Sequence, residues 1–386
     1  MSDNLSPTVA SGATAGATAP SPTMEKLNNW LAAMDKLKAS DLHLRVGSPP
    51  LYRVNTIPQR LKDDAVASDF MVSLKKELLG RMQSEQFDRD MAADFSYSLA
   101  GHGRYRVNFF MQRGSYALVA RRVPFQVPQM EKLGLPPGVM KLLEADTGII
   151  MTVGMTGSGK STTLASLIDH INHSKRLHII TIEDPIEFLY RNDKSFISQR
   201  EIGSDAPNFH VAMRSSLRQD PDIILVGEIR DLETMSTALV ASETGHLVFG
   251  TLHATNVQQT ITRVLDFFPS HQQAMTRDTL SNVLQGVMAQ KLVPGITAER
   301  PLVLVMELMV TNPAIRKYIA DGNDDKVQEG LRSMSKEGMQ DFNMAFAQLV
   351  KGGLISPEVA YENSPNPEQL RMNLRGLMLS SDQATK

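Results

Sequence analysis

The residues with the clearest chemical signature form a glycine-rich segment near the middle of the chain. Residues 154–162 fit the pattern G-x-x-x-x-G-K-[ST], which is typical of loops that bind phosphate groups. Glycines let the backbone turn its amide groups toward an anion, Lys160 is placed to reach the β- and γ-phosphates, and the Ser161 hydroxyl is placed to bind Mg²⁺. The segment therefore predicts a nucleoside triphosphate site formed by Gly154, Thr156, Gly157, Ser158, Gly159, Lys160, Ser161 and Thr162.

Three more side chains with catalytic chemistry follow apolar runs that are typical of strands. They are Glu183 after residues 177–182, Glu228 after residues 223–226 and His253 after residues 247–250. Ligands of open α/β sheets bind outside the carboxyl ends of the strands, so we expect these side chains to lie near the phosphates. Glu183 is a candidate to bind metal or polarise water, and His253 is a candidate to contact the γ-phosphate. The alternative is that each acidic residue only caps the helix after it.

Glu228 is the candidate catalytic base. It follows the most apolar predicted strand, where a Walker B carboxylate belongs. The residue before it is Gly227, at a position where many P-loop enzymes carry a metal-binding aspartate. We therefore interpret Glu228 as the group that orients or deprotonates water, and not as a direct Mg²⁺ ligand.

Strands and helices alternate around these residues. The glycine-rich segment lies between an apolar run over 148–153 and a helical spacing of apolar residues over 162–172, which is the strand, turn and helix context that the motif requires. Further along, predicted strands alternate with predicted helices over 209–217 and 232–241, a pattern that is typical of a parallel α/β sheet. A chance match in an unrelated loop is the alternative, and this context disfavours it.

The chain before this region has a different organisation. A helix capped by Thr23, a helical stretch over 68–90 and several strands, one of them over 51–57, predict a compact α+β domain. The predicted parts of the whole chain are a disordered tail over 1–23, the α+β domain over 24–123, a proline- and glycine-rich linker over 124–138, the α/β domain over 139–375 and a flexible tail over 376–386.

Arginines concentrate at the end of the α+β domain, at Arg104, Arg106, Arg113, Arg121 and Arg122. One interpretation is a solvated sheet face or a nonspecific anion patch. The other is that some of these arginines meet phosphate oxygens of a nucleotide on a neighbouring subunit, as arginine fingers do. The sequence alone leaves both interpretations open.

Composition excludes several functional classes. The 386 residues are 42% hydrophobic and 21% charged, as in ordinary globular proteins, and the net charge of −2 predicts no general attraction to nucleic acid. The absence of cysteine excludes disulfides, thiolate metal sites and cysteine nucleophiles, and is compatible with a reducing cytoplasm. No apolar run approaches the ~20 residues that span a bilayer, so we expect membrane association only through a partner protein.

Four blocks together resemble a known family. They are residues 154–162, 182–187, 217–231 and 243–253, which correspond to the Walker A, Asp-box, Walker B and His-box motifs of the type IV pilus retraction ATPases of the PilT and PilU type, within the secretion ATPase superfamily. The resemblance extends from about Met24 to Arg375. Four blocks in this order are more specific than a P-loop alone.

The resemblance implies a PAS-like N-terminal domain joined to a RecA-like P-loop ATPase domain, assembled as a homohexamer with ATP and Mg²⁺ bound between domains. It implies that Glu228 is the catalytic carboxylate, Glu183 the Asp-box glutamate and His253 the His-box histidine, and it suggests Arg104 and Arg121 as nucleotide contacts. Such a ring would pull pilin subunits out of the fibre through an inner-membrane platform protein. The motor would be cytoplasmic and peripheral to the inner membrane.

Two regions depart from the PilT pattern. PilT-type motors carry an Ala-Ile-Arg-Asn-Leu-Ile-Arg-Glu block, which residues 314–321 match only in part. Residues 337–371 look more like PilU, the accessory retraction ATPase, which favours a chain that works beside a PilT paralogue.

Three other functions are compatible with parts of the sequence. Pilus extension and type II secretion ATPases resemble the chain, but they usually carry a four-cysteine zinc site, and this chain has no cysteine. A DNA-acting RecA-like ATPase would need basic loops that the charge balance does not indicate. A nucleotide-binding regulator without turnover would need only the phosphate loop.

Overall fold

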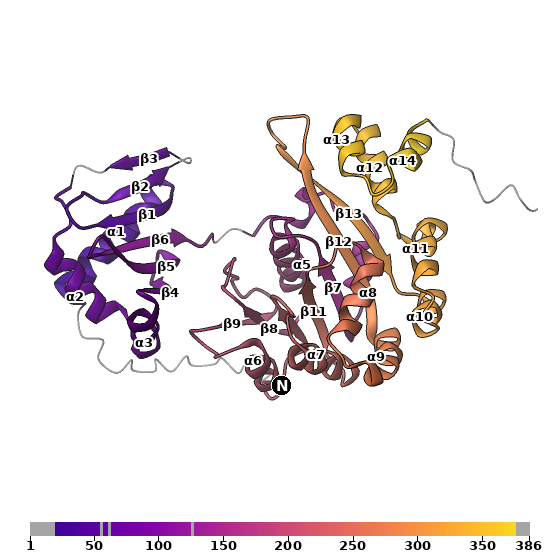
Figure 1. Cartoon of the computed structure of the whole chain (residues 1–386), viewed down its shortest axis with the longest axis horizontal. Helices are drawn as coiled ribbons and strands as arrows, with labels where there is room; N and C mark the ends of the chain where they lie inside the picture. The colour runs from indigo at the N-terminus through magenta and orange to yellow at the C-terminus, as the bar shows by residue number, and fades with distance from the viewer. Residues whose placement is uncertain (1–19, 55–56, 61–62, 125–126, 376–386) are drawn as a thin grey trace, which may run out of the picture. The chain divides into compact units, whose positions relative to one another are not determined.

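The computed structural model describes residues 20–54, 57–60, 63–124 and 127–375. The chain divides into two compact units, Met1–Arg122 and Val123–Lys386 (Figure 1). Each unit has its own hydrophobic core. The predicted tail over 376–386 and most of the one over 1–23 lie outside the described residues.

The first unit is a six-stranded antiparallel sheet in the order β3-β2-β1-β6-β5-β4, with helices packed on one face. Its strands are β1 (Ala39–Arg45), β2 (Leu51–Val54), β3 (Ile57–Arg60), β4 (Ala92–Leu99), β5 (Gly103–Gln112) and β6 (Ser115–Arg122). Its helices are α1 (Pro22–Leu37), α2 (Ser68–Leu78) and α3 (Arg81–Asp90). This is the small α+β domain expected ahead of the ATPase domain.

Alternation along the strands decides which face the helices cover. In β1, Leu42 and Leu44 are buried against the helices, whereas Asp41, His43 and Arg45 point to the opposite face. Trp30 of α1 lies in the same core. The sheet therefore presents one apolar and one largely polar face.

Three local predictions differ from the structure. Helix α1 begins at Pro22, because the side chain of Ser21, and not Thr23, accepts the hydrogen bond from the Met24 amide. The helical stretch over 68–90 is two helices, since residues at Leu79 and Gly80 leave the helical conformation. The strand over 51–57 is the start of a hairpin, β2 and β3.

The second unit is built on a seven-stranded sheet in the order β13-β12-β7-β11-β10-β8-β9. The strands from β12 to β9 run parallel, and β13 pairs antiparallel with β12. The strands are β7 (Gly148–Val153), β8 (His178–Glu183), β9 (Phe196–Glu201), β10 (Ile223–Val226), β11 (Leu247–Leu252), β12 (Leu284–Pro294) and β13 (Leu302–Val310). The sequence analysis predicted the parallel core but not the β12–β13 hairpin.

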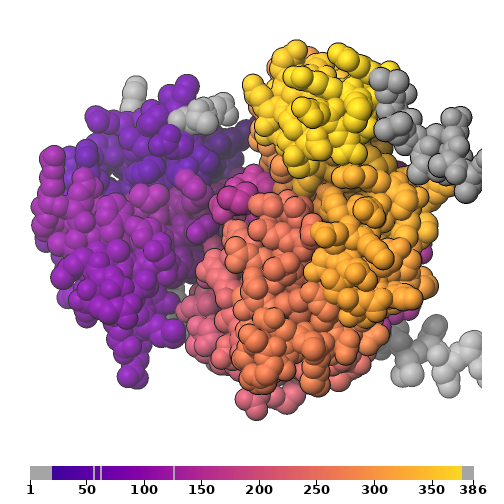
Figure 2. Space-filling view, turned by 45° about the vertical axis from the view of Figure 1, so that its right-hand side comes forward, coloured from indigo at the N-terminus to yellow at the C-terminus, as the bar shows by residue number. Residues whose placement is uncertain are grey.

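Helices cover both faces of this sheet. One face packs against α4 (Val139–Leu142) and α5 (Lys160–Ser174). The other packs against α6 (Phe209–Ser216), α7 (Leu232–Glu243), α8 (Val257–Asp266), α9 (Ser270–Val283), α10 (Pro313–Ala320), α11 (Asp324–Ser333), α12 (Phe342–Lys351), α13 (Pro357–Asn363) and α14 (Pro367–Leu374). In the space-filling view the helices after β13, in orange and yellow, form one continuous surface on this unit (Figure 2). Among the described residues, no helix has the length and apolar character needed to cross a bilayer.

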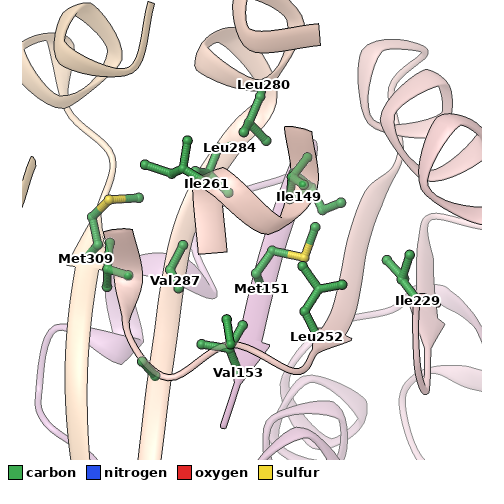
Figure 3. Packing of buried hydrophobic residues seen from close by; sticks show 14 of the residues in the cluster. Ile149, Met151, Val153, Ile229, Leu252, Ile261, Leu280, Leu284, Val287 and Met309 are labelled. Atoms are coloured by element: carbon green, nitrogen blue, oxygen red, sulfur yellow. The ribbon is translucent and has the colours of Figure 1, made fainter. Parts of the chain in front are cut away.

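Burial on both faces explains the continuous apolar strands. Ile149 and Met151 of β7 pack with Val287 of β12 and Leu280 of α9 in one cluster, as Figure 3 shows. Ile150, between the first two, belongs to the cluster on the other face, with α5. Charged side chains are disfavoured within such strands and collect where the strands end.

The segment predicted as a linker over 124–138 packs partly on the second unit. The Ser166 hydroxyl of α5 donates a hydrogen bond to the Pro128 carbonyl at 2.5 Å. A short 3₁₀ turn, Met130–Lys132, follows and lies against α5. Val139 and Leu142 of α4 then enter the core.

We predict that Phe109→Ala lowers the free energy of unfolding of the first unit by about 3–5 kcal/mol. Phe109 is fully buried and its ring packs against Phe87 and Tyr116. Urea unfolding of the full chain, followed by the fluorescence of the single tryptophan, Trp30, measures this unit specifically. Met82→Ala, at a side chain that is 57% exposed, is the control and is expected to change stability by less than about 0.5 kcal/mol.

Candidate functional site

The phosphate-loop segment joins β7 to α5 through three glycines with positive φ. These are Gly154 at 153°, Gly157 at 80° and Gly159 at 88°. A Cβ at residue 154 would lie 2.5 Å from the carbonyl oxygen of Gln290, so no other residue fits there without moving the neighbouring strand. Gly159 immediately precedes Lys160 and Ser161, the first residues of α5. The amide groups at this helix start favour an anion.

Gln290 of β12 holds the phosphate loop through a hydrogen bond, and it was not among the residues predicted from the sequence. Its Nε2 donates a hydrogen bond to the Ser158 carbonyl at 2.7 Å, and its side chain is 1% exposed. A glutamine in an apolar run more than a hundred residues after the loop gives no local sign of this contact. Only the parallel pairing of β12 with β7 brings the two together.

Lys160 lies across the mouth of the loop. Its Nζ donates hydrogen bonds to the carbonyls of Gly154 at 2.8 Å and Met155 at 3.1 Å. Burial lowers the pKa of this ammonium group, and the nearby Glu228 carboxylate partly opposes the shift. A phosphate group at the loop would satisfy the same charge, so Lys160 is positioned to bind one.

A cavity of about 580 Å³ lies above the loop and the carboxyl ends of the parallel strands. Its wall includes Lys160 and Ser161 from the loop and Glu183, Glu228 and His253 from the strand ends. The structure thus brings all three predicted strand-end residues to one site with the phosphate loop. The catalytic role of each of them stays a prediction.

Glu228 makes the strongest contacts in the cavity. Its Oε1 lies 2.9 Å from Nε2 of His253, and its Oε2 accepts a hydrogen bond from the guanidinium of Arg230. The hydrogen bond from Arg230 lowers the pKa of this carboxyl below its usual range, because it favours the charged form, and His253 adds to the effect. Arg230 was absent from the predicted site residues; its position two residues after Glu228 places it nearby, but spacing in a loop does not fix the direction of a side chain.

Gly227 explains why the carboxylate stands at position 228. A Cβ at residue 227 would lie 3.1 Å from the Ile182 carbonyl oxygen and 3.3 Å from Cα of Glu183. The Gly227 amide also donates to the Ile182 carbonyl at 2.7 Å, which holds it against β8. An aspartate at 227 would crowd that strand, so the next residue carries the acid.

Glu183 is held by neighbours on its own and the adjoining strand. Its Oε1 accepts hydrogen bonds from the Thr181 hydroxyl at 2.7 Å and from Nε2 of Gln199 at 3.2 Å. Burial nevertheless raises the pKa of this carboxyl, and these hydrogen bonds oppose the shift. The pKa of Glu183 is therefore raised, whereas that of Glu228 is lowered.

The donor set of the cavity fits Mg²⁺ bound together with a nucleotide. Among the described residues, no group of three or more His, Asp and Glu side chains could hold a metal alone. Mg²⁺ in nucleotide sites usually keeps several waters and takes one or two protein oxygens besides the phosphates. The Ser161 hydroxyl at the start of α5 and the carboxylates of Glu183 and Asp184 supply such oxygens at the cavity wall.

Arg104 and Arg121 belong to the first unit. Arg121 Nε donates to Oδ1 of the buried Asp41 at 2.7 Å, and Arg104 Nη1 donates to the Ser98 hydroxyl at 3.2 Å. Burial works to raise the pKa of Asp41, but hydrogen bonds from Ser40 and Arg121 outweigh it and lower that pKa. The contact of both arginines with a nucleotide stays a prediction.

We predict that Arg230→Gln moves the acidic limb of the pH–rate profile for ATP hydrolysis to higher pH. The guanidinium lowers the pKa of Glu228, so removing it lets this carboxyl take up a proton at a higher pH and lose its function as a base. The profile of kcat between about pH 4 and pH 8 measures the shift, a range that spans the usual Glu pKa. Arg230→Lys keeps a positive charge and should shift the limb less; an unmoved limb in Arg230→Gln would contradict the pairing.

Comparison with known proteins agrees with this geometry. Residues 118–354 match the family model described as type II/IV secretion system protein. The chain is 42% identical to the type IV pilus retraction ATPase PilT of Pseudomonas aeruginosa, over 89% of this chain and 99% of that protein. It is 34% identical to the PilU ATPase of the same organism, over 89% and 90% of the two chains. A crystal structure of the pilus retraction motor PilT with bound ADP has a TM-score of 0.79 and 43% identity, over 89% of this chain and 98% of that one.

These likenesses cover both units, and they combine with a phosphate loop, a strand-end glutamate and a histidine around one cavity. The chain is therefore an ATPase of the type II/IV secretion system protein family, in the branch that contains PilT and PilU.

Proposed function

We propose that ATP hydrolysis by this chain powers the retraction of a type IV pilus, and hence twitching motility. The observation that carries the proposal is Glu228 in one cavity with Lys160 and His253, in a chain similar over almost its whole length to a pilus retraction ATPase. A bound nucleotide would place its γ-phosphate between the loop and these side chains.

Each residue of the cavity has its own role in the proposed reaction. Lys160 and the amides at the start of α5 would bind the phosphates, and Ser161 would hold a Mg²⁺ ion, which would neutralise phosphate charge. Glu228 takes a proton from the water that attacks the γ-phosphorus, as the bond to the bridging oxygen of ADP breaks. Arg230 has to release Glu228 before the carboxylate can act in this way. His253, on the other carboxylate oxygen, orients Glu228 and faces the γ-phosphate.

The motor would work as a homohexamer in the cytoplasm, peripheral to the inner membrane, and act on the pilus through an inner-membrane platform protein. Arg104 and Arg121 would then reach the nucleotide from the first unit, in their own or a neighbouring subunit.

Whether the chain is a main or an accessory motor concerns the C-terminal helices. Residues 314–321 match the PilT block only in part, and residues 337–371 resemble PilU, which favours an accessory ATPase beside a PilT paralogue. Identity over the whole match is higher with PilT, at 42%, than with PilU, at 34%. The overall identity therefore favours a main retraction motor of the PilT type, whereas the C-terminal helices favour the accessory type.

We predict that Glu228→Gln binds ATP normally but slows hydrolysis by about 10²–10⁴-fold, the usual contribution of a general base. In a strain that lacks the chromosomal gene, the wild-type chain should restore twitching and Glu228→Gln should not. Hydrolysis is measured with purified protein and Mg²⁺, and ATP binding by isothermal titration. Equal turnover in both proteins would rule out Glu228 as the base, and normal twitching without the gene would refute the proposed role.

We predict that Arg104→Ala subunits reduce the ATPase activity of wild-type subunits in mixed rings. If Arg104 contacts a nucleotide on its neighbour, one altered subunit disables a site that it does not itself contain, so activity falls faster than the altered fraction rises. Rates are measured over a series of mixing ratios. A loss in strict proportion would argue against action between subunits. Arg113→Ala, from the same basic region, is the matched control.

A further inference from the structure

Glu307 is a carboxylate buried outside the nucleotide cavity. It lies on β13 and is 1% exposed. Its Oε1 accepts a hydrogen bond from the Val257 amide at 2.8 Å, and its Oε2 accepts one from Nε2 of Gln328 at 3.0 Å. Burial raises the pKa of this carboxyl, and both hydrogen bonds oppose the shift. Because a buried carboxylate is costly unless it is fully hydrogen-bonded, the two partners are held firmly in place.

The first partner links Glu307 to the catalytic residues. Val257 is the first residue of α8 and follows His253 by four positions. At the other end of this short segment, His253 Nε2 lies 2.9 Å from Oε1 of Glu228. Asn256 caps α8 by accepting from the Gln259 amide, so residues 253–257 are tied at both ends. The position of Val257 therefore limits where the His253 ring can lie.

The second partner links Glu307 to the C-terminal helices. Gln328 belongs to α11, and Gln258 of α8 donates a second hydrogen bond to that helix, to Oδ1 of Asp325 at 2.8 Å. The start of α8 and helix α11 are thus connected twice, once in the core through Glu307 and once at the surface.

We propose that Glu307 is a positioning residue: by holding the first amide of α8 it sets His253 against Glu228. The proposal rests on the roles given above to His253 and Glu228. It assigns no contact between Glu307 and the nucleotide. Glu307 would affect hydrolysis only by fixing the position of His253.

Two substitutions each remove the hydrogen bond between the Val257 amide and Oε1 of Glu307. Glu307→Leu removes the acceptor. Val257→Pro removes the donor, and proline is favoured at the first position of a helix. Asn256 before it has φ −156° and ψ 176°, an extended conformation that proline tolerates in its predecessor. Each variant is expected to lower kcat on the order of tenfold, because a small misplacement of catalytic groups has a large effect on rate. The KM for ATP should stay within about twofold, since Lys160 and the phosphate loop are not altered.

Glu307→Gln tests for rescue. Its amide oxygen still accepts from Val257, and the Oε1 of Gln328, which is buried without a hydrogen-bond partner, can turn to accept from the new amide group. We expect kcat within about twofold of wild type. The double variant Glu307→Leu with Val257→Pro should lose no more than either single variant, because both changes remove the same hydrogen bond.

Asp324→Asn is the matched control. Asp324 pairs with Arg277 at 2.6 Å and joins α11 to α9, so its loss loosens α11 without touching the His253 segment. Its kcat should equal that of wild type. All proteins are tested as full chains with matched circular dichroism spectra and elution volumes; if Glu307→Leu fails to fold, Val257→Pro serves in its place.

Two outcomes would overturn the proposal while Glu228→Gln remains inactive. One is wild-type kcat in both Glu307→Leu and Val257→Pro. The other is an equal loss of kcat in Asp324→Asn or in Glu307→Gln, which would point to general loosening or to the charge itself. Full activity of Glu228→Gln would instead refute the assignment of the catalytic base. This measurement therefore distinguishes a failure of that assignment from a failure of the proposal for Glu307.

Discussion

The structure of the second unit depends on strands that are buried on both faces. Strands β7, β10 and β11 expose no side chain to solvent, so a charged group along them would be costly. The polar side chains within β7 and β11 are the threonines Thr152 and Thr251, and the charged side chains follow where the strands end. Parallel pairing brings those ends to one edge, where the helix after β7 also begins. Nucleotide chemistry is located there because the core leaves no other place for it.

This constraint explains why so much could be predicted from sequence. The motif at 154–162 is local, and the runs that end at Glu183, Glu228 and His253 carry their own signal in apolar character. Strand β10 occupies 223–226 as expected. In the first unit, Leu42 and Leu44 alternate with polar neighbours, a pattern that is typical of a half-buried strand. The errors were the cap of α1, the division of residues 68–90 into two helices, and the two hairpins β2–β3 and β12–β13.

What could not be predicted depends on pairs that are distant in sequence. Gln290 supports the phosphate loop because β12 happens to lie beside β7, and nothing near Gln290 in the sequence indicates that. In the sequence, Glu307 is a single charged residue within an apolar strand. Only the structure shows that Val257 and Gln328 donate hydrogen bonds to its two oxygens. Arg230 is different, since it is close to Glu228 in the chain. It was missed because the direction of a side chain in a loop does not follow from spacing.

The pairing of Arg230 with Glu228 also bears on how fast ATP is hydrolysed when no mechanical work is done. If Glu228 is the catalytic base, as proposed, its pairing with a guanidinium makes it a weak proton acceptor, and the pair would have to separate for each turnover. The basal rate of ATP hydrolysis would then depend on how often that separation occurs. A group that draws Arg230 away from Glu228, such as a carboxylate of a neighbouring subunit, would then raise the rate of hydrolysis.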